Sequence, residues 1–141
     1  MNLRKNLKRR LFNCAKKILR SAAITPLFWR WLFTQISFIT KPADPKFTIL
    51  VLDRHRFWPG DLARIGEKNQ LLELPLKCRT FLHSLFFEGG ELGQLRYGKA
   101  SEGAFLAKEE AFKKYFKDFL LWLAARRDIN FVMSSNYMYL E

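Results

Sequence analysis

Apolar and basic positions alternate through the first forty residues in a way that predicts two helical segments. From Leu3 to Leu19 the apolar side chains recur every three or four positions, the period of an α-helix, and basic residues occupy the other faces. Pro26 then breaks or restarts the helix. The segment PLFWRWLF that follows is rich in aromatic residues. The pattern predicts an amphipathic basic helix followed by an aromatic helical segment.

From residue 47 onward, short apolar runs alternate with helical patterns. Phe47–Leu52 is a continuous run rich in β-forming residues, which predicts a strand buried on both faces. Pro59 suits the first turn of a helix, and Gly66 is a plausible stop for it. Gln70–Leu74 is the second predicted strand. Together they predict a βαβ unit with parallel strands and a right-handed crossover.

The same alternation continues to the end of the chain. After Pro75 an apolar stripe at helical spacing predicts a second helix, formed by Cys78, Phe81, Leu82, Leu85 and Phe86. Glu88–Gly103 holds five of the seven glycines and predicts a flexible loop. Ser101 can cap the long helix that follows, and Arg126 and Arg127 favour its C-terminal end. The segment INFVMSS predicts a third buried strand.

The order β-α-β-α-(loop)-α-β predicts an α/β fold, namely a partial doubly wound (Rossmann-like) parallel sheet preceded by a basic amphipathic N-terminal helical segment. KPADPK, residues 41–46, is typical of a linker because its two prolines cannot continue a helix. We therefore divide the chain into a segment, residues 1–41, and a Rossmann-like N-terminal domain, residues 42–141. Three strands are few for such a sheet, so we expect this domain to be truncated.

The net charge of +12 belongs almost entirely to the N-terminal segment. Residues 1–43 contain ten Lys and Arg and no acidic residue, whereas residues 44–141 contain fifteen against thirteen acidic residues. A basic segment of this kind indicates an anionic partner, and a near-neutral body does not.

An anionic membrane surface is the partner that this segment favours. Trp-Arg-Trp at residues 29–31 suits the headgroup level, and each Lys or Arg near an anionic leaflet contributes about 1 kcal/mol. A spanning helix needs about twenty apolar residues, which Pro26, Arg30 and Gln35 interrupt. The predicted membrane-binding residues are Arg4, Lys5, Lys8, Arg9, Arg10, Lys16, Lys17, Trp29, Arg30 and Trp31. Two alternatives stay open: a helix packed on a protein domain, and a nucleic-acid arm, although no RNP, KH or zinc-finger pattern is present.

The cysteines indicate neither a disulfide framework nor a metal site. Cys14 and Cys78 are isolated, with no CxxC pair and no nearby His cluster. The pattern favours a reducing compartment and predicts no metal.

Candidate chemistry follows the first and third predicted strands, because ligands bind beyond the carboxyl ends of parallel strands. In DRHRFWPGD, Asp53 or His55 can act as a base, and Arg54 or Arg56 can meet a phosphate. The alternative is a polar loop whose charges neutralise one another. In SSNYMY, hydroxyl, amide and aromatic side chains suit the binding of sugar hydroxyls. The alternative is that they form hydrogen bonds between the end of the sheet and nearby loops. The candidate residues are Ser134, Ser135, Asn136, Tyr137 and Tyr139. The glycine-rich loop does not match G-x-G-x-x-G or a P-loop.

TILVLDRHRFWPGDLARIGEKNQLLELP together with DINFVMSSNYMY resembles the N-terminal Rossmann-like half of GT-B-type glycosyltransferase-like proteins of bacterial surface-polysaccharide biosynthesis. The resemblance covers residues 47–141. It implies a domain that receives the acceptor, a glycan or a lipid-linked sugar, with the nucleotide-sugar donor held by a second half. By that resemblance the acceptor side of the cleft would be lined by Asp53, His55, Ser135, Asn136 and Tyr137. It also implies a cytoplasmic protein peripheral to the inner membrane.

Three functions are consistent with these patterns. The first is the acceptor-side half of a membrane-associated glycosyltransferase, inactive alone and without a cofactor in this chain. The second is a non-enzymatic membrane-surface adaptor with an α/β protein-binding module. The third is a basic nucleic-acid binder, whose affinity would fall steeply with salt.

Overall fold

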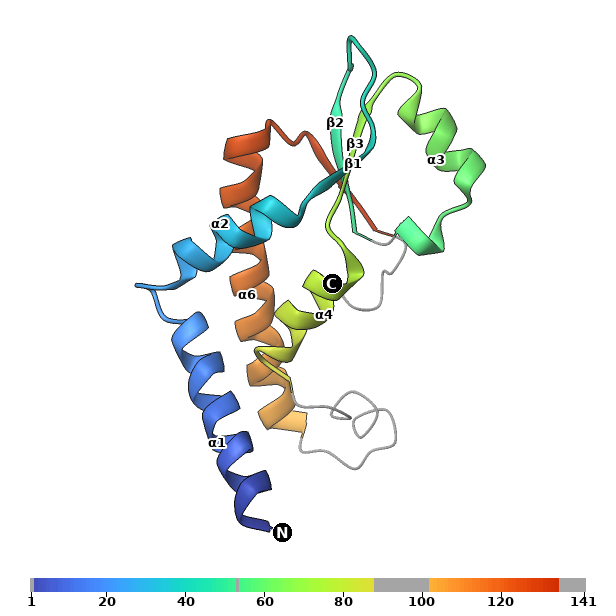
Figure 1. Cartoon of the computed structure of the whole chain (residues 1–141). Helices are drawn as coiled ribbons and strands as arrows, with labels where there is room; N and C mark the ends of the chain where they lie inside the picture. The colour runs from blue at the N-terminus through green and yellow to red at the C-terminus, as the bar shows by residue number, and fades with distance from the viewer. Residues whose placement is uncertain (1, 53, 88–101, 135–141) are drawn as a thin grey trace.

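A four-stranded sheet organises the part of the chain that the computed structural model describes, residues 2–52, 54–87 and 102–134 (Figure 1). Its strands are β1 (Ser37–Thr40), β2 (Thr48–Val51), β3 (Gln70–Glu73) and β4 (Phe131–Met133). They lie in the order β1-β3-β2-β4. Strand β2 is parallel to both β3 and β4, as the sequence predicts for the three strands of the body.

The prediction of an all-parallel sheet is wrong at one edge. Strand β1 runs antiparallel to β3, with Ser37 opposite Glu73, so the sheet is mixed. The sequence gives little sign of this strand because SFIT is short and follows directly on an aromatic helical segment. What reveals β1 is its pairing with β3, a contact between residues more than thirty positions apart in sequence.

The prediction that the third strand is buried is also wrong. Phe131 and Val132 of β4 are 54% and 45% exposed. Strand β4 lies at the end of the sheet order, so within the described part of the chain it has one neighbouring strand, whereas β2 has two. A continuous apolar run is therefore buried in β2 and exposed in β4, and position in the sheet makes the difference.

The described helices begin and end close to the predicted signals. They are α1 (Asn2–Leu19), α2 (Thr25–Gln35), the short 3-10 turn η1 (Arg54–Arg56), α3 (Pro59–Gly66), α4 (Leu76–Ser84) and α6 (Glu102–Arg127). Proline stands in the first turn of α2 and of α3. Helix α6 is followed by Asp128 in the left-handed region, with φ of 49°, which is a common helix ending. Ser101 and most of the predicted glycine-rich loop lie outside the described residues.

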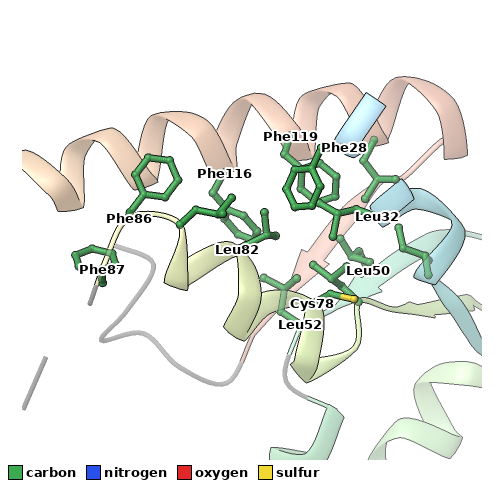
Figure 2. Packing of buried hydrophobic residues seen from close by; sticks show 14 of the residues in the cluster. Phe28, Leu32, Leu50, Leu52, Cys78, Leu82, Phe86, Phe87, Phe116 and Phe119 are labelled. Carbon is green, nitrogen blue, oxygen red and sulfur yellow. The ribbon is translucent and has the colours of Figure 1, made fainter. Parts of the chain in front are cut away.

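Helices cover both faces of the sheet. Alternate residues of β2 point to opposite faces, so Leu50 and Leu52 join one apolar cluster and Val51 joins the other. Helix α3 lies on one side, whereas α2, α4 and α6 lie on the other (Figure 1). Figure 2 shows the larger cluster, where Leu82 of α4 and Phe119 of α6 pack towards the sheet. This arrangement confirms an α/β fold with an N-terminal helix.

The predicted N-terminal segment contributes unequally to this core. From α2 and the residue after it, Phe28, Leu32 and Ile36 are buried in the larger cluster. Along α1, by contrast, Leu19 at the C-terminal end is the residue that packs against that cluster. Residues 25–40 therefore share the core and the sheet of the body, while most of α1 lies on the surface. In the described ranges, no helix is both long enough and apolar enough to cross a membrane.

Candidate functional site

The carboxyl ends of the three parallel strands β2, β3 and β4 lie at the same end of the sheet. Val51 lies opposite Met133 on one side and opposite Glu73 on the other. The backbone N–H of Leu52 donates to the Met133 carbonyl at 2.9 Å. Both polar segments that the sequence singles out follow strands that end here, one after β2 and one after β4. The topology therefore brings the starting points of the two candidate segments together.

The structure places only some of the predicted site residues. Arg54 and Arg56 lie exposed in η1, with the His55 backbone between them. Ser134 follows β4 and is half-buried. The other candidates lie outside the described residues: Asp53, Ser135, Asn136, Tyr137 and Tyr139. The first candidate segment is thus partly placed, and the second is placed only at its start.

Arg54 forms an ion pair with a residue that sequence reasoning missed. Its Nη1 lies 3.1 Å from Oε2 of Glu73, the last residue of β3. The two side chains are 53% and 22% exposed, so the pair contributes at most about 1 kcal/mol to stability. Glu73 is the one acidic residue in QLLEL, and this interruption of an apolar run was the available signal. The pair neutralises part of the Arg54 charge from a strand outside the loop that carries Arg54.

A groove of about 520 Å³, here called the α3 groove, lies beside this ion pair. Its apolar lining comes from β1, α3 and the turn before α3, including Ile39, Phe57 and Leu62. Arg54 and Glu73 supply charged groups, and Thr40 supplies a hydroxyl. Such a combination of apolar lining and few polar groups is typical of small-ligand sites.

Trp58 is a second residue that sequence reasoning missed at this site. It is 78% exposed, and its chain neighbours Phe57 and Pro59 both line the α3 groove. An exposed indole offers an apolar face for a ring and an N–H donor for a hydroxyl. The tryptophan within RFWPGD was visible in the sequence, but its exposure depends on the tertiary structure.

Two ionisable groups with shifted pKa values lie in or against the core. Burial raises the pKa of the Cys78 thiol above its usual 9.0, and the nearby Lys77 charge offsets part of this. Burial also raises the pKa of the Tyr115 hydroxyl. The neighbouring Trp29, Thr25 and Arg20 side chains lower this pKa in part. Both side chains pack in or against the larger apolar cluster, so neither is a candidate for chemistry at the strand ends. Within the described residues, no group of three His, Cys, Asp or Glu side chains could hold a metal ion.

Helix α1 presents a second candidate surface. Leu7, Leu11 and Ile18 are 60%, 62% and 56% exposed, and exposed Cys14 completes an i, i+4, i+7, i+11 stripe on one face. Cationic residues flank this stripe, with Arg10 and Lys17 on one side and Arg4 and Lys8 on the other. We call these eight residues the α1 stripe. None of residues 4–19 of α1 is fully buried in the described structure, so this surface can meet a partner.

The two tryptophans of the predicted membrane-binding set lie in different surroundings. Trp31 is 48% exposed, beside exposed Arg30. Trp29 instead packs inward, with its ring centroid 5.6 Å from that of Tyr115 and 5.8 Å from that of Phe119. The Trp29 indole N–H and the Tyr115 hydroxyl are both buried. Trp31 is therefore the better placed of the two to meet a membrane.

The fold and the strand-end site together define an α/β protein with a mixed four-stranded sheet. Comparison with protein-family models, curated proteins and solved structures finds no significant match for this chain.

Proposed function

We propose that this chain is the acceptor-side half of a membrane-associated glycosyltransferase, which transfers a sugar from a nucleotide-sugar to a surface glycan or lipid-linked acceptor. The chain is inactive without a second domain that binds the donor. The observation that carries this proposal is that β2 and β4 end side by side, where the Leu52 N–H donates a hydrogen bond to the Met133 carbonyl. The resemblance of residues 47–141 to the GT-B class supplies the reaction.

The connections around β2 support a partial doubly wound arrangement. The chain leaves β2 through α3 to reach β3 on one side, and later leaves β3 through α4 and α6 to reach β4 on the other side. Helices α3 and α6 cover opposite faces of the sheet. In open α/β sheets, ligands bind at the point where the strand order reverses in this way. That point is the end of β2 beside the end of β4.

The roles follow from the chemistry of the two segments. Asp53 or His55 accepts the proton of the acceptor hydroxyl as its oxygen bonds to the anomeric carbon of the donor sugar, and the bond from that carbon to the nucleoside diphosphate breaks. Arg54 and Arg56 hold the acceptor's phosphate where it is lipid-linked. The sugar hydroxyls bond to Ser134, Ser135, Asn136, Tyr137 and Tyr139. The α1 stripe, with Trp31 and Arg30, keeps the site at the cytoplasmic face of the inner membrane.

The test uses the complete natural reading frame that contains this chain. Its product is incubated with labelled nucleotide-sugars and a lipid extract, and transfer of the label is measured. We expect His55→Ala or Asp53→Ala to lower kcat/KM by about 100-fold or more, because a general base is lost. As a matched control away from the candidate site, Leu106→Ala changes a side chain on α6 that is 55% exposed, and it should retain the rate.

Either of two results would reject the glycosyltransferase proposal. One is a reading frame that closes without a second α/β domain. The other is a complete product that transfers none of the labelled sugars although it is folded. The second candidate, a non-enzymatic membrane-surface adaptor, then takes its place. The Arg54–Glu73 pair favours the adaptor, because Glu73 already neutralises the Arg54 charge that would otherwise bind an anionic ligand.

A further inference from the structure

The two edges of the sheet differ in how they are protected against pairing. At the β1 edge the register shifts between Phe38 and Thr40, and Lys41 and Pro42 follow the strand. The Lys41 ammonium lies 4.8 Å above the Phe38 ring. Bulges, lysines and prolines are the usual devices that prevent an edge strand from pairing with another chain.

The β4 edge has none of these devices among its three residues. Phe131, Val132 and Met133 carry neither charge nor proline, and the first two side chains are about half exposed. Strand β4 is the last in the sheet order, so its outer backbone faces no further strand in the described part of the chain. An apolar edge of this kind is a template for strand addition.

An apolar groove of about 630 Å³ runs beside this edge, between β4 and α6. Its lining includes buried Leu52 and Phe116, and it also includes exposed Leu121 and Val132. Leu121 is 60% exposed, and together with Phe131 and Val132 it adds to the exposed apolar surface at this edge. The open strand and the open groove adjoin, so one partner can cover both.

The charges on α6 favour a second copy of this chain as that partner. Lys113 and Lys117 line the groove. The same helix carries Glu109 and Glu110, which lie 3.4 Å and 3.7 Å from the Lys113 ammonium, and Asp118, which lies 3.0 Å from the Lys114 ammonium. These charges are largely balanced within the helix, so a second copy that packs on it meets little net repulsion. The α1 stripe of another molecule would instead bring cations to the two lysines.

We propose that β4 pairs antiparallel with β4 of a second copy about a twofold axis perpendicular to the sheet. The two sheets then become one continuous sheet, and the two α6 helices pack antiparallel over the seam. The Leu121 and Val132 side chains of each copy fill the groove of the other. Such an interface is isologous and closes as a dimer, which removes the unprotected edge.

Light scattering coupled to size-exclusion chromatography tests this proposal on the full chain. We expect twice the chain mass of 16.7 kDa. Val132→Lys should weaken the dimer by about 100-fold or more, since it places a charge in the desolvated seam. Phe38→Lys is the matched control, because Phe38 is 43% exposed on the protected edge, against 45% for Val132. It should leave the mass unchanged.

Two further variants keep the result interpretable. Leu121→Lys changes the groove without touching strand pairing, and it should also give a monomer. Leu11→Lys alters the α1 stripe and should leave the dimer intact. Circular dichroism confirms that each variant is folded. A monomer at the highest attainable concentration would overturn the proposal. So would a dimer that persists in both Val132→Lys and Leu121→Lys, or one lost only in Leu11→Lys.

Discussion

At the residue scale, the contact between Gly66 and Thr40 holds α3 against β1. A Cβ built on Gly66 would lie 2.7 Å from Thr40 Oγ1 and would also overlap its Cγ2 methyl group. The same hydroxyl donates to the Asn69 carbonyl at 3.0 Å and accepts from the Leu71 N–H at 3.3 Å. Gly66 is therefore required because strand β1 approaches it closely. Its position at the end of α3 is a second reason for a glycine there.

We expect Gly66→Ala to lower the free energy of unfolding by about 1–3 kcal/mol, because it displaces Thr40. Urea denaturation measures the change. Gly60→Ala is the matched control on the same helix, since a Cβ there meets nothing within 4 Å. In a Thr40→Ala background the loss should shrink, because the overlapping atoms are gone. Equal stability of the Gly66→Ala and Gly60→Ala proteins would contradict this account.

At the scale of elements, α2 is both a surface helix and a core helix. Its aromatic and apolar residues predict a membrane-interface segment, yet Leu32 is fully buried and Phe28 is 7% exposed. Away from these two residues, Leu27 is 59% exposed, and Trp31, whose ring stacks on Phe28, is 48% exposed. The helix therefore contributes one face to the larger apolar cluster and leaves the other for a partner.

This division predicts unequal costs for two leucines five residues apart. Leu32→Ala should lower the free energy of unfolding by about 2–5 kcal/mol, because it leaves a cavity in the core. Leu27→Ala should change it by no more than about 0.5 kcal/mol, as is usual at exposed positions. Both are measured by urea denaturation. Equal effects would mean that α2 does not pack on the body as described.

At the scale of the whole molecule, basic charge and exposed apolar surface coincide on α1. The body is nearly neutral, whereas the first 43 residues carry ten cations and no acid. The α1 stripe sets its apolar residues between flanking cations, which suits a helix lying in the plane of an anionic membrane surface. The apolar side chains that would be buried in the membrane and the cations that would attract anionic lipids are thus on the same helix.

Flotation with lipid vesicles measures this attachment. The chain should bind vesicles that contain phosphatidylglycerol more tightly than vesicles of phosphatidylcholine alone, and added salt should weaken the difference. Leu11→Asn should reduce binding by about tenfold, since apolar burial is lost. Leu106→Asn on α6 is the matched control, because Leu106 is 55% exposed there. If Leu11→Asn binds as well as the parent chain, α1 does not attach the protein. Salt-sensitive binding to DNA duplexes but not to vesicles would favour the nucleic-acid alternative.

Local signals in the sequence located most of the elements. Proline at the first turn of α2 and α3, the buried run that became β2 and the apolar stripe of α4 all depend on neighbours within a few residues. The position of the candidate site at the strand ends also followed from the predicted βαβ order. Backbone conformation and side-chain spacing act over such short ranges, so one sequence suffices to predict them.

The remaining features depend on contacts between distant segments. Pairing of SFIT with β3 decided that the sheet is mixed, and the absence of an outer neighbour in the described sheet decided that β4 is exposed. The Arg54–Glu73 pair joins residues nineteen positions apart, and Trp29 turns inward because α6 packs over it. Sequence by itself determined the helices, the parallel strands and the basic α1. Only the tertiary structure decided which of their faces are covered, because burial depends on what packs against a residue from elsewhere in the chain.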